Sequence, residues 1–437
     1  MEPFWSKWAI HFESKQVERV LRENKIGALT VCLLPQKSEE YSLDPPREPQ
    51  RLHHDFCCTT PAASETHANI LQQHFLTPNE ALYIRNHGPV PSHLSAASHV
   101  VTFSLAAHDG SRAIETCLSL IELRERFGSA DVISVMQCAG NRQIDDFHKW
   151  GVNGFTGTPF QSLKSGMVGN SLYSGVRLDA LLRALYPSQC RQEAASPGTW
   201  HVVFSGADQY ESSTPLGLLL QPDTDALLAF DMNKEALSPD HGFPVRAVLP
   251  GIAGARSVKW LEGVTLSPVP SSAPWNAHYY RNCKQEHIQK LPLNSIILSP
   301  GPKSVMRLRE DGSGSVSVKG VAYSGGENSS IASVEVTADG GKSWLRARLL
   351  REEREAVPEE AVGDHSWVRF VAEVPVMLDV RNETAGQHKI QVNSRATDSL
   401  GKVQPEESSG GQRSYIYDGW GAASLTAVRG TSTEDAR

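Results

Sequence analysis

The sequence predicts an α+β protein in which a mixed domain of helices and strands precedes an immunoglobulin-like β-sandwich. Three observations predict this fold class. The chain has 437 residues, more than a single compact domain usually holds. Helical and strand patterns alternate from residue 61 to residue 292. From 293 to 425, short alternating segments follow one another with turn signals and little helix, which is typical of a sandwich.

The composition is that of an ordinary globular protein, with 40% hydrophobic and 21% charged residues. A formal net charge of -7 gives no support to a nucleic-acid partner, because phosphate backbones attract basic surfaces. No run of about 18 apolar residues occurs, so no membrane span is expected. The N-terminus has no apolar signal core. Seven irregularly spaced cysteines favour reduced thiols in an intracellular, soluble protein, without distinguishing cytoplasm, peroxisome and mitochondrion.

Residues 1–60 are predicted to be an N-terminal extension. One amphipathic helix is predicted over 14–24, and the prolines at 35, 45, 46 and 49 then interrupt regular structure. Residues 426–437 are predicted to be a C-terminal tail.

The mixed domain, 61–292, has four clear elements. Apolar residues at helical spacing predict a helix over Ala113–Phe127, which ends at Gly128. A buried strand is predicted over Val132–Met136, directly before a glycine-containing loop that holds Cys138. A helix over Leu178–Tyr186 and a strand over Trp200–Phe204 follow.

The sandwich is predicted from five alternating segments. They are Ser315–Tyr323, Ser333–Thr337, Trp344–Leu349, Trp367–Val376 and His388–Asn393. Asp339-Gly340-Gly341 separates two of them and predicts a hairpin turn.

Cys138 is the first candidate for chemistry. A cysteine at the end of a strand can be a nucleophile, a metal ligand or a packed apolar residue, and for an isolated cysteine the packed interpretation is favoured. Three further segments, at 83–91, 240–246 and 250–260, gather arginine, histidine and lysine around glycines. Such segments suit an anion, because glycine lets backbone N–H groups approach it and arginine offers a planar fork. Solvated polar turns are the alternative.

Four segments together resemble the eukaryotic sulfite oxidase and nitrate reductase family. They are YIRNHGPVP at 83–91, QCAGNR at 137–142, DHGFPVR at 240–246 and PGIAGARSVKW at 250–260. The resemblance covers about residues 61–425 and is closest to the haem-free plant-type sulfite oxidases. It implies a molybdopterin-binding domain of the sulfite oxidase type at 61–292. It also implies that the sandwich at 293–425 is a dimerisation domain, and hence that the protein is a homodimer.

The resemblance also implies the residues that hold the cofactor. The cysteine of the CAGNR motif binds molybdenum in that family, which assigns Cys138 as the metal ligand; thiolate is a soft ligand for such a metal. The implied contacts of the molybdenum–molybdopterin cofactor are Tyr83, Ile84, Arg85, Asn86, His87, Asp208, His241, Arg246, Ser257, Val258 and Lys259.

For the substrate, the resemblance implies oxidation of sulfite to sulfate at Arg85, Tyr280 and Arg413. Tyr280 follows Trp275 by five residues, as the active-site tyrosine of the family does, and Tyr279 is its rival. The match at Arg413 needs a two-residue gap, so an ordinary surface arginine is the alternative there.

Several features depart from the family pattern. Gln143 stands where sulfite oxidases usually have a second arginine, and an expected tryptophan before Gly166 is missing, with Phe160 or Leu163 nearby. A weaker sulfite site or another oxo-transfer substrate, as in a nitrate or sulfoxide reductase, is the consequence to test. No His-Pro-Gly-Gly occurs, so no haem is expected and the electrons would pass to oxygen, or to a cytochrome. A cofactor-free dimeric scaffold is the alternative of another class.

Overall fold

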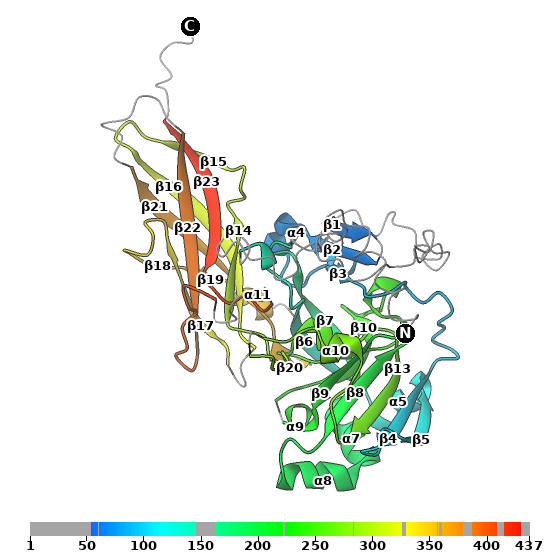
Figure 1. Ribbon diagram of the computed structural model, residues 1–437. Coiled ribbons are helices and arrows are strands. Elements are labelled where there is room, and N and C mark those ends of the chain that lie inside the picture. Colours follow the sequence, from blue (N-terminus) through cyan, green and yellow to red (C-terminus); the bar gives the residue numbers. More distant parts are fainter. Residues whose placement is uncertain are drawn as a thin grey trace, which may run out of the picture.

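The computed structural model describes most of the chain from residue 54 to residue 429. The described ranges are 54–59, 61–145, 163–221, 223–282, 284–325, 329–355, 357, 361–378, 387–408 and 415–429. Arg413, Phe160 and the helix predicted over 14–24 lie outside them. Figure 1 shows a larger mixed domain beside an elongated body of long strands. In these ranges no helix is long and apolar enough to cross a membrane.

Within the described residues, the mixed domain contains three sheets. A small sheet has the order β1-β2-β3, and its first strand begins within the range predicted as the N-terminal extension. A second sheet has the order β5-β4-β13-β8-β9. The bounds of these strands are β1 His54–Thr59, β2 Ala62–Thr66, β3 Ile84–Arg85, β4 Val100–Ala106, β5 Arg112–Ser119, β8 His201–Gly206, β9 Glu211–Pro215 and β13 Leu261–Ser267.

The third sheet positions Cys138. Its order is β11-β10-β7-β6-β20, with β12 paired to β10. Strand β6 runs between β7 and β20 and is buried from Val132 to Gln137, which confirms the predicted strand. The bounds are β6 Ala130–Gln137, β7 Val168–Arg177, β10 Leu227–Met232, β11 Glu235–Ala236, β12 Arg246–Val248 and β20 Ala361–His365.

The helix predicted over Ala113–Phe127 was wrong for its first half. Arg112–Ser119 forms strand β5, which pairs with β4 along its whole length. The helix, α5 (Leu120–Phe127), begins where the side chains of Ser119 and Glu122 cap each other's backbone N–H groups. It ends at Gly128, as predicted, with a φ of 72°. Pairing with β4 outweighs the helical spacing, because this hairpin extends a sheet in which β4 also pairs with the distant strand β13.

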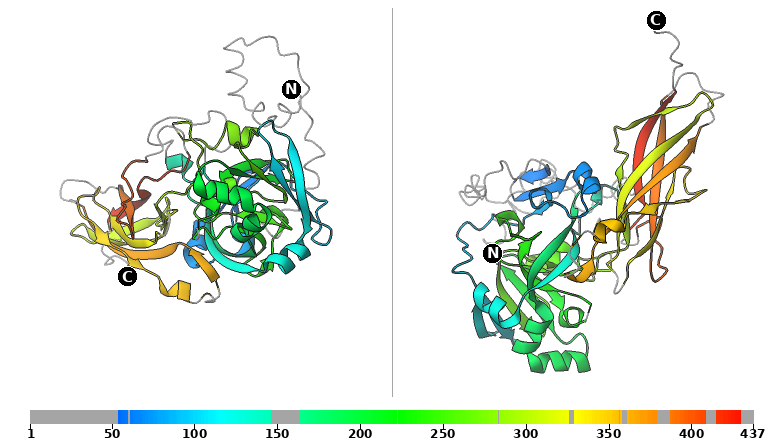
Figure 2. Two further views of the ribbon diagram at one scale, coloured as in Figure 1. Left: turned by 90° about the horizontal axis from the view of Figure 1, so that it is seen from below. Right: turned by 180° about the vertical axis from the view of Figure 1, so that it is seen from behind.

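The remaining helices are short. Helix α7 (Leu178–Leu185) confirms the predicted helix and buries Leu178, Leu181 and Leu182. Helix α8 (Pro187–Ala195) follows it at the end of the domain farthest from the sandwich (Figure 2). The others are α4 Ala68–Gln73, α9 Leu216–Leu219, α10 Pro274–Ala277 and α11 Glu352–Glu355, with 3-10 turns η2 Asn79–Ala81, η4 Pro239–His241 and η5 Gly254–Arg256.

The C-terminal strands form the predicted sandwich. One sheet has the order β14-β16-β21-β19 and the other β15-β23-β22-β17-β18. Their facing side chains, among them Val318, Val334 and Phe370, make a separate core. Gly340 and Gly341 have φ values of 73° and 86° in the predicted turn between β17 and β18. The bounds are β14 Asn294–Ser299, β15 Val305–Leu308, β16 Ser313–Tyr323, β17 Ile331–Thr337, β18 Leu345–Arg346, β19 Arg348–Leu349, β21 Val368–Met377, β22 Gln387–Asp398 and β23 Gly421–Arg429.

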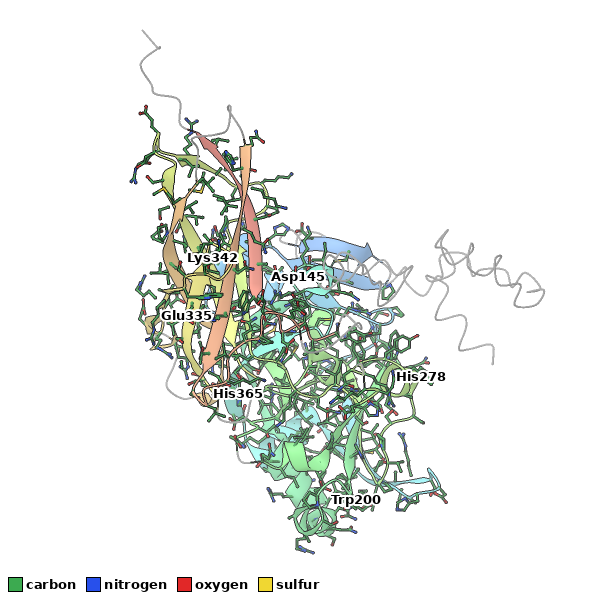
Figure 3. All side chains as sticks on the ribbon, turned by 60° about the vertical axis from the view of Figure 1, so that its left-hand side comes forward. Asp145, Trp200, His278, Glu335, Lys342 and His365 are labelled. Carbon is green, nitrogen blue, oxygen red and sulfur yellow. The ribbon has the colours of Figure 1, made fainter. Side chains whose placement is uncertain are left out.

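The two domains interlock. Strand β20 comes from the C-terminal part of the chain, yet it pairs in parallel with β6 of the mixed domain. His365, at its end, contacts Asp225 with Nε2 3.1 Å from Oδ2, and Figure 3 marks His365 where the two bodies meet. Trp367 is buried, and its Nε1–H donates to the carbonyl oxygen of Phe75 at 3.0 Å. The strand that leads to Cys138 therefore has neighbours from both domains.

Candidate active site

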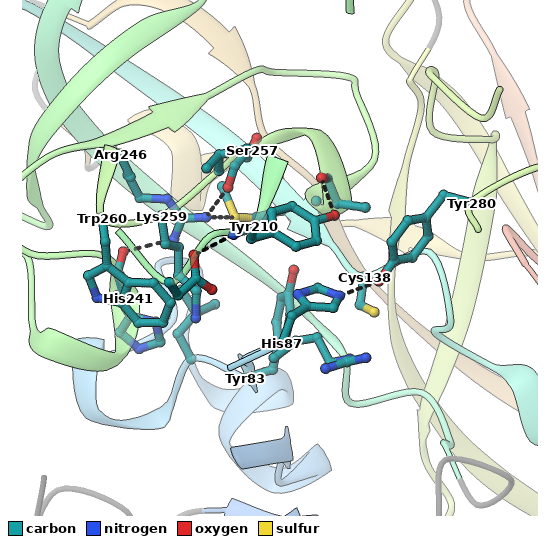
Figure 4. A pocket seen from close by; sticks show the side chains of 17 residues that line it. Tyr83, His87, Cys138, Tyr210, His241, Arg246, Ser257, Lys259, Trp260 and Tyr280 are labelled. Carbon is teal, nitrogen blue, oxygen red and sulfur yellow. Dashed lines mark hydrogen bonds between the residues drawn. The ribbon is translucent and has the colours of Figure 1, made fainter. Parts of the chain in front are cut away.

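One pocket gathers the residues that the sequence analysis singled out (Figure 4). Ile84 and Asn86 are buried beside this pocket, in the segment that supplies Tyr83, Arg85 and His87. Arg413 lies outside the described residues. The predicted residues that line the pocket are Tyr83, Arg85, His87, Cys138, Asp208, His241, Arg246, Ser257, Val258, Lys259 and Tyr280.

Cys138 is the first residue after β6, and its free thiol lines the pocket. Its backbone N–H donates to the carbonyl oxygen of Met167 at 3.0 Å, which continues the β6–β7 pairing by one residue. The N–H of Gly140 approaches Sγ at 3.4 Å. Burial raises the pKa of the Cys138 thiol, while the Arg85 guanidinium and the Gly140 N–H oppose that rise by favouring the thiolate. A bound metal ion would complete the deprotonation.

Tyr280 and His87 form a hydrogen-bonded pair next to Cys138. The Tyr280 hydroxyl lies 2.5 Å from Nε2 of His87. Burial raises the pKa of Tyr280 to about 12, so the phenol stays protonated near pH 7. Burial, together with the charges of Arg85 and Lys259, lowers the pKa of His87 well below its usual value, so the imidazole stays neutral. Tyr280 adopts a φ of 52°, a left-handed backbone conformation that is rare for tyrosine and common at functional sites.

Arg85 brings a positive charge to the same end of the pocket. It ends β3, and its Nη1 donates to the carbonyl oxygen of Asn86. Its charge opposes the burial effect on the pKa values of both Cys138 and Tyr280, so it lies close enough to act on each.

The other end of the pocket carries two further cations. Buried Arg246 donates to the carbonyl oxygens of His241 and Ser257, each at 3.0 Å. Lys259 Nζ donates to the carbonyl oxygen of Asp240 at 2.8 Å and to the side chain of Asn86. Burial lowers the pKa of Arg246, and lowers that of Lys259 to about 7. Both pKa values fall because burial removes water from the positively charged groups. An anion in the pocket would compensate for this loss of solvation.

Sequence reasoning missed several residues of the pocket. Tyr210 stacks on His87 with ring centroids 4.2 Å apart, and its hydroxyl donates to the carbonyl oxygen of Ala255 at 2.8 Å. Trp260 is fully buried, and its Nε1–H donates to the carbonyl oxygen of Pro239 at 2.7 Å. Tyr210 follows Asp208 by two residues, so its place beside a predicted contact was the available signal. Tyr415 does not line the pocket, but its ring lies 5.3 Å from that of Tyr280; its place two residues after the predicted Arg413 was the available signal.

The residues that depart from the family pattern also lie near Cys138. Gln143 is buried, and its backbone N–H donates to the carbonyl oxygen of Gly140 at 3.2 Å. Leu163, near the place of the missing tryptophan, is buried in the same apolar cluster as Cys138. A neutral amide and an aliphatic side chain therefore stand beside the thiol loop.

The pocket fits the molybdenum–molybdopterin cofactor. A Cβ atom on Gly254 would lie only 2.8 Å from both Tyr83 Oη and the carbonyl oxygen of Gln137, so glycine is needed where this wall closes. The thiol suits a soft transition metal, and Arg246 and Lys259 suit a phosphate. Thiol and cations occupy opposite ends of one elongated pocket in Figure 4, as a cofactor with a metal at one end and a phosphate at the other requires.

Comparisons with known proteins agree with this fit. The family model described as oxidoreductase molybdopterin binding domain matches residues 87–275. The model described as Mo-co oxidoreductase dimerisation domain matches residues 285–420. Sulfane dehydrogenase SoxCD from Paracoccus pantotrophus has a similar fold, with a TM-score of 0.61 and 24% identity over 83% of this chain and 84% of that chain.

Curated relatives match over most of their length. Sulfite oxidase from Gallus gallus is 34% identical, over 93% of this chain and 84% of the relative. Mitochondrial sulfite oxidase from Homo sapiens is 31% identical, over 93% of this chain and 71% of the relative. Sulfite oxidase from Arabidopsis thaliana is 30% identical, over 87% and 95%. The chain therefore belongs to the sulfite oxidase family of molybdopterin oxidoreductases.

Proposed function

We propose that this protein oxidises sulfite to sulfate with a molybdopterin-bound molybdenum ion and passes the electrons to oxygen. The observation that carries the proposal is the pocket in which Cys138 and Tyr280 lie at one end and Arg246 and Lys259 at the other. Arg85 also lines this pocket, and its charge acts on Cys138 and Tyr280. The names of the relatives from chicken, human and Arabidopsis support sulfite as the substrate. Electron transfer to oxygen follows from the resemblance to the plant type.

In this proposal, the protein holds the cofactor from both ends. Cys138 would hold molybdenum through its thiolate. Arg246 and Lys259 neutralise the phosphate, while His241, Ser257 and Asp208 bind polar atoms of the pterin. When bound, the cofactor supplies a metal centre that accepts two electrons and exchanges one oxygen atom.

The substrate would bind at the Cys138 end. The Arg85 guanidinium holds anionic oxygens of sulfite, and a charge-assisted contact of this kind contributes about 1.5–3 kcal/mol. The Tyr280 hydroxyl stays protonated because its pKa is about 12, so it can donate to an oxygen atom at the reacting centre. Neutral His87 fixes the position of that hydroxyl at 2.5 Å. Sulfite and water together give sulfate, two protons and two electrons.

Gln143 favours a second candidate, a different oxo-transfer substrate. Where an arginine would add positive charge beside the Cys138 loop, the buried amide adds none. A charge-assisted contact contributes about 1.5–3 kcal/mol, so the lack of one at this position lowers the affinity for sulfite by about tenfold or more. Gln143→Arg should therefore lower KM for sulfite if sulfite is the substrate.

The test uses purified protein with its molybdenum and pterin contents measured. Sulfite-dependent peroxide formation reports oxygen as the acceptor, and ferricyanide reduction reports turnover without it. We expect both, and we expect Cys138→Ser to lose turnover by at least about a hundredfold, because the metal loses its protein ligand. Cys117→Ser, an exposed thiol, is the matched control. Full metal loading without sulfite turnover would defeat sulfite as substrate; ferricyanide reduction without peroxide would replace oxygen by a cytochrome.

The dimerisation domain supports a homodimer, assembled through the region matched at 285–420. Such an interface would be two-fold symmetric, with the same surface of each subunit in contact.

A further inference from the structure

The loop that carries Cys138 is held by one segment of the sandwich domain, residues 415–420. The backbone N–H of Ile416 donates to the carbonyl oxygen of Ala139 at 2.7 Å. One residue earlier, the ring of Tyr415 packs at 5.3 Å against the ring of Tyr280. The same short segment thus contacts the Cys138 loop and the tyrosine at the same end of the pocket.

Arg142 makes the strongest link in this contact. Its side chain is only 2% exposed, although it carries a charge. Nη1 donates to the carbonyl oxygen of Gly419 at 2.9 Å, and Nη2 to that of Trp420 at 2.6 Å. The guanidinium also lies 4.5 Å from the ring centroid of Tyr417. Three residues of segment 415–420, Tyr417, Gly419 and Trp420, therefore contact one side chain from the Cys138 loop.

Further side chains bind Arg142 or hold the carbonyl groups that accept its hydrogen bonds. Asn294 Oδ1 accepts from Nη1 at 2.8 Å, and Asn294 Nδ2 donates to the carbonyl oxygen of Tyr417 at 2.9 Å. Gln404 Nε2 donates to the carbonyl oxygen of Gly419 at 2.8 Å. On the loop side, Asp145 Oδ2 accepts from Nε of Arg142 at 2.8 Å. A buried, fully connected network of this kind specifies one geometry.

Backbone hydrogen bonds connect Arg142 to Cys138. Arg142 adopts a left-handed φ of 65°, and its N–H donates to the carbonyl oxygen of Lys164 at 2.5 Å. The Asn141 N–H donates to the carbonyl oxygen of Cys138 at 3.0 Å. Arg142 itself does not line the pocket, so its donors face the sandwich domain and not the substrate.

We propose that Arg142 is a positioning residue, through which segment 415–420 of the sandwich domain sets the position of the Cys138 thiol. The inference rests on the role of Cys138 in the proposed function. It makes the sandwich part of the active-site framework as well as a dimerisation domain. Lysine cannot replace Arg142, because a single ammonium group cannot match several acceptors arranged around a planar guanidinium.

The first test measures alkylation of Cys138 by iodoacetamide in full-length, cofactor-free protein, by mass spectrometry of each cysteine peptide. We expect Arg142→Met to raise the rate at Cys138 by at least about tenfold, because a loop that opens locally exposes its thiol. Arg142→Lys should raise it less and serves if the methionine variant does not fold. Cys190, buried in the core of the same domain, is the internal reference and should keep its rate.

Trp367→Phe is the matched control for weakening the domain interface. It removes the hydrogen bond to Phe75 without touching the Cys138 loop, and it should leave the rate at Cys138 unchanged. The proposal is overturned if neither Arg142 variant raises that rate. It is also overturned if the alkylation rate of Cys190 rises in parallel, or if Trp367→Phe raises the rate at Cys138 equally. Either result would mean that the whole domain opens more often, and not the Cys138 loop alone.

The second test uses the cofactor-loaded enzyme. For Arg142→Lys we expect kcat with sulfite to fall by about tenfold while KM stays within about twofold, because the substrate contacts remain and only their alignment with the thiol changes. A rise in KM with unchanged kcat would place Arg142 in substrate binding and overturn the proposal. Absence of sulfite turnover in the wild type would count against the proposed function, and the alkylation experiment would still test Arg142.

Discussion

Lys259 shows how a single side chain is tuned by its surroundings. It comes from the PGIAGARSVKW segment, and its ammonium group points to Asn86 and the carbonyl oxygen of Asp240. Burial, followed by the charge of nearby Arg246, lowers its pKa to about 7. A lysine that is only about half protonated at neutral pH would regain its full charge beside a phosphate.

Lys259→Met should therefore weaken cofactor retention. Loss of one charge-assisted contact costs about 1.5–3 kcal/mol, which corresponds to a loss of affinity of about tenfold or more. The measurement is the pterin content per chain after gel filtration. Lys319→Met, on the exposed face of β16, is the control and should retain the wild-type content. Equal retention in both variants would remove Lys259 from the phosphate site.

Glu65 is a buried carboxyl group that the proposed reaction does not use. It lies on β2, and its Oε1 accepts from the N–H of Gly166 at 3.3 Å. Burial raises the pKa of Glu65 to about 7 from 4.5. In the folded state it therefore binds a proton more tightly than in the unfolded chain, so its stabilising contribution is present below pH 4.5 and is lost as the pH rises through 7.

Glu65→Gln should remove that pH dependence. Between pH 5 and pH 8 the wild type should lose roughly 2 kcal/mol more unfolding free energy than the variant, at about 1.4 kcal/mol per pKa unit. Urea unfolding at both pH values measures the difference. If the unfolding free energy of the two proteins changes equally between pH 5 and pH 8, the carboxyl group of Glu65 titrates in the same range when folded and unfolded.

At the scale of elements, β6 depends on the close packing of its neighbours. Strand β7 lies between β6 and β10, and Gly175 of β7 faces the backbone of β10. A Cβ atom there would lie 2.1 Å from the carbonyl oxygen of Leu228 and 2.6 Å from Cα of Ala229. Since both are backbone atoms, the strands would have to separate.

Gly175→Ala should therefore destabilise the protein by about 1–3 kcal/mol, the usual effect of overpacking. Thermal or urea unfolding measures it. Gly301→Ala is the matched control, because a Cβ atom at Gly301 meets nothing within 4 Å. We expect that control to remain within about 0.5 kcal/mol of the wild type. A Gly175→Ala protein as stable as the control would mean that β7 and β10 can move apart freely.

At the scale of the whole molecule, two domains share one functional region. The sandwich supplies β20 to the sheet of the mixed domain and segment 415–420 to the Cys138 loop. Heat should therefore unfold both domains in one transition. If one domain unfolded alone, the edge of β6 and the charge of Arg142 would be exposed.

Light scattering tests the homodimer directly. We expect a molar mass of about twice the 47.8 kDa of the chain. A concentration-independent mass equal to one chain would contradict dimerisation through the region 285–420.

Local patterns in the sequence determined the family, most of the cofactor pocket, strand β6 and the sandwich, because motifs and alternating apolar residues act over a few neighbouring positions. Only the tertiary structure decided what depends on distant partners. Arg112–Ser119 became a strand because it pairs with β4, and β4 is held in its sheet by the distant strand β13. Tyr210 joined the pocket because folding brought its ring onto that of His87. Tyr415 does not line the pocket, but folding brought its ring against that of Tyr280. Arg142, four residues from Cys138, became a link between domains because Asn294, Gly419 and Trp420, which accept hydrogen bonds from it, lie more than 150 positions away along the chain.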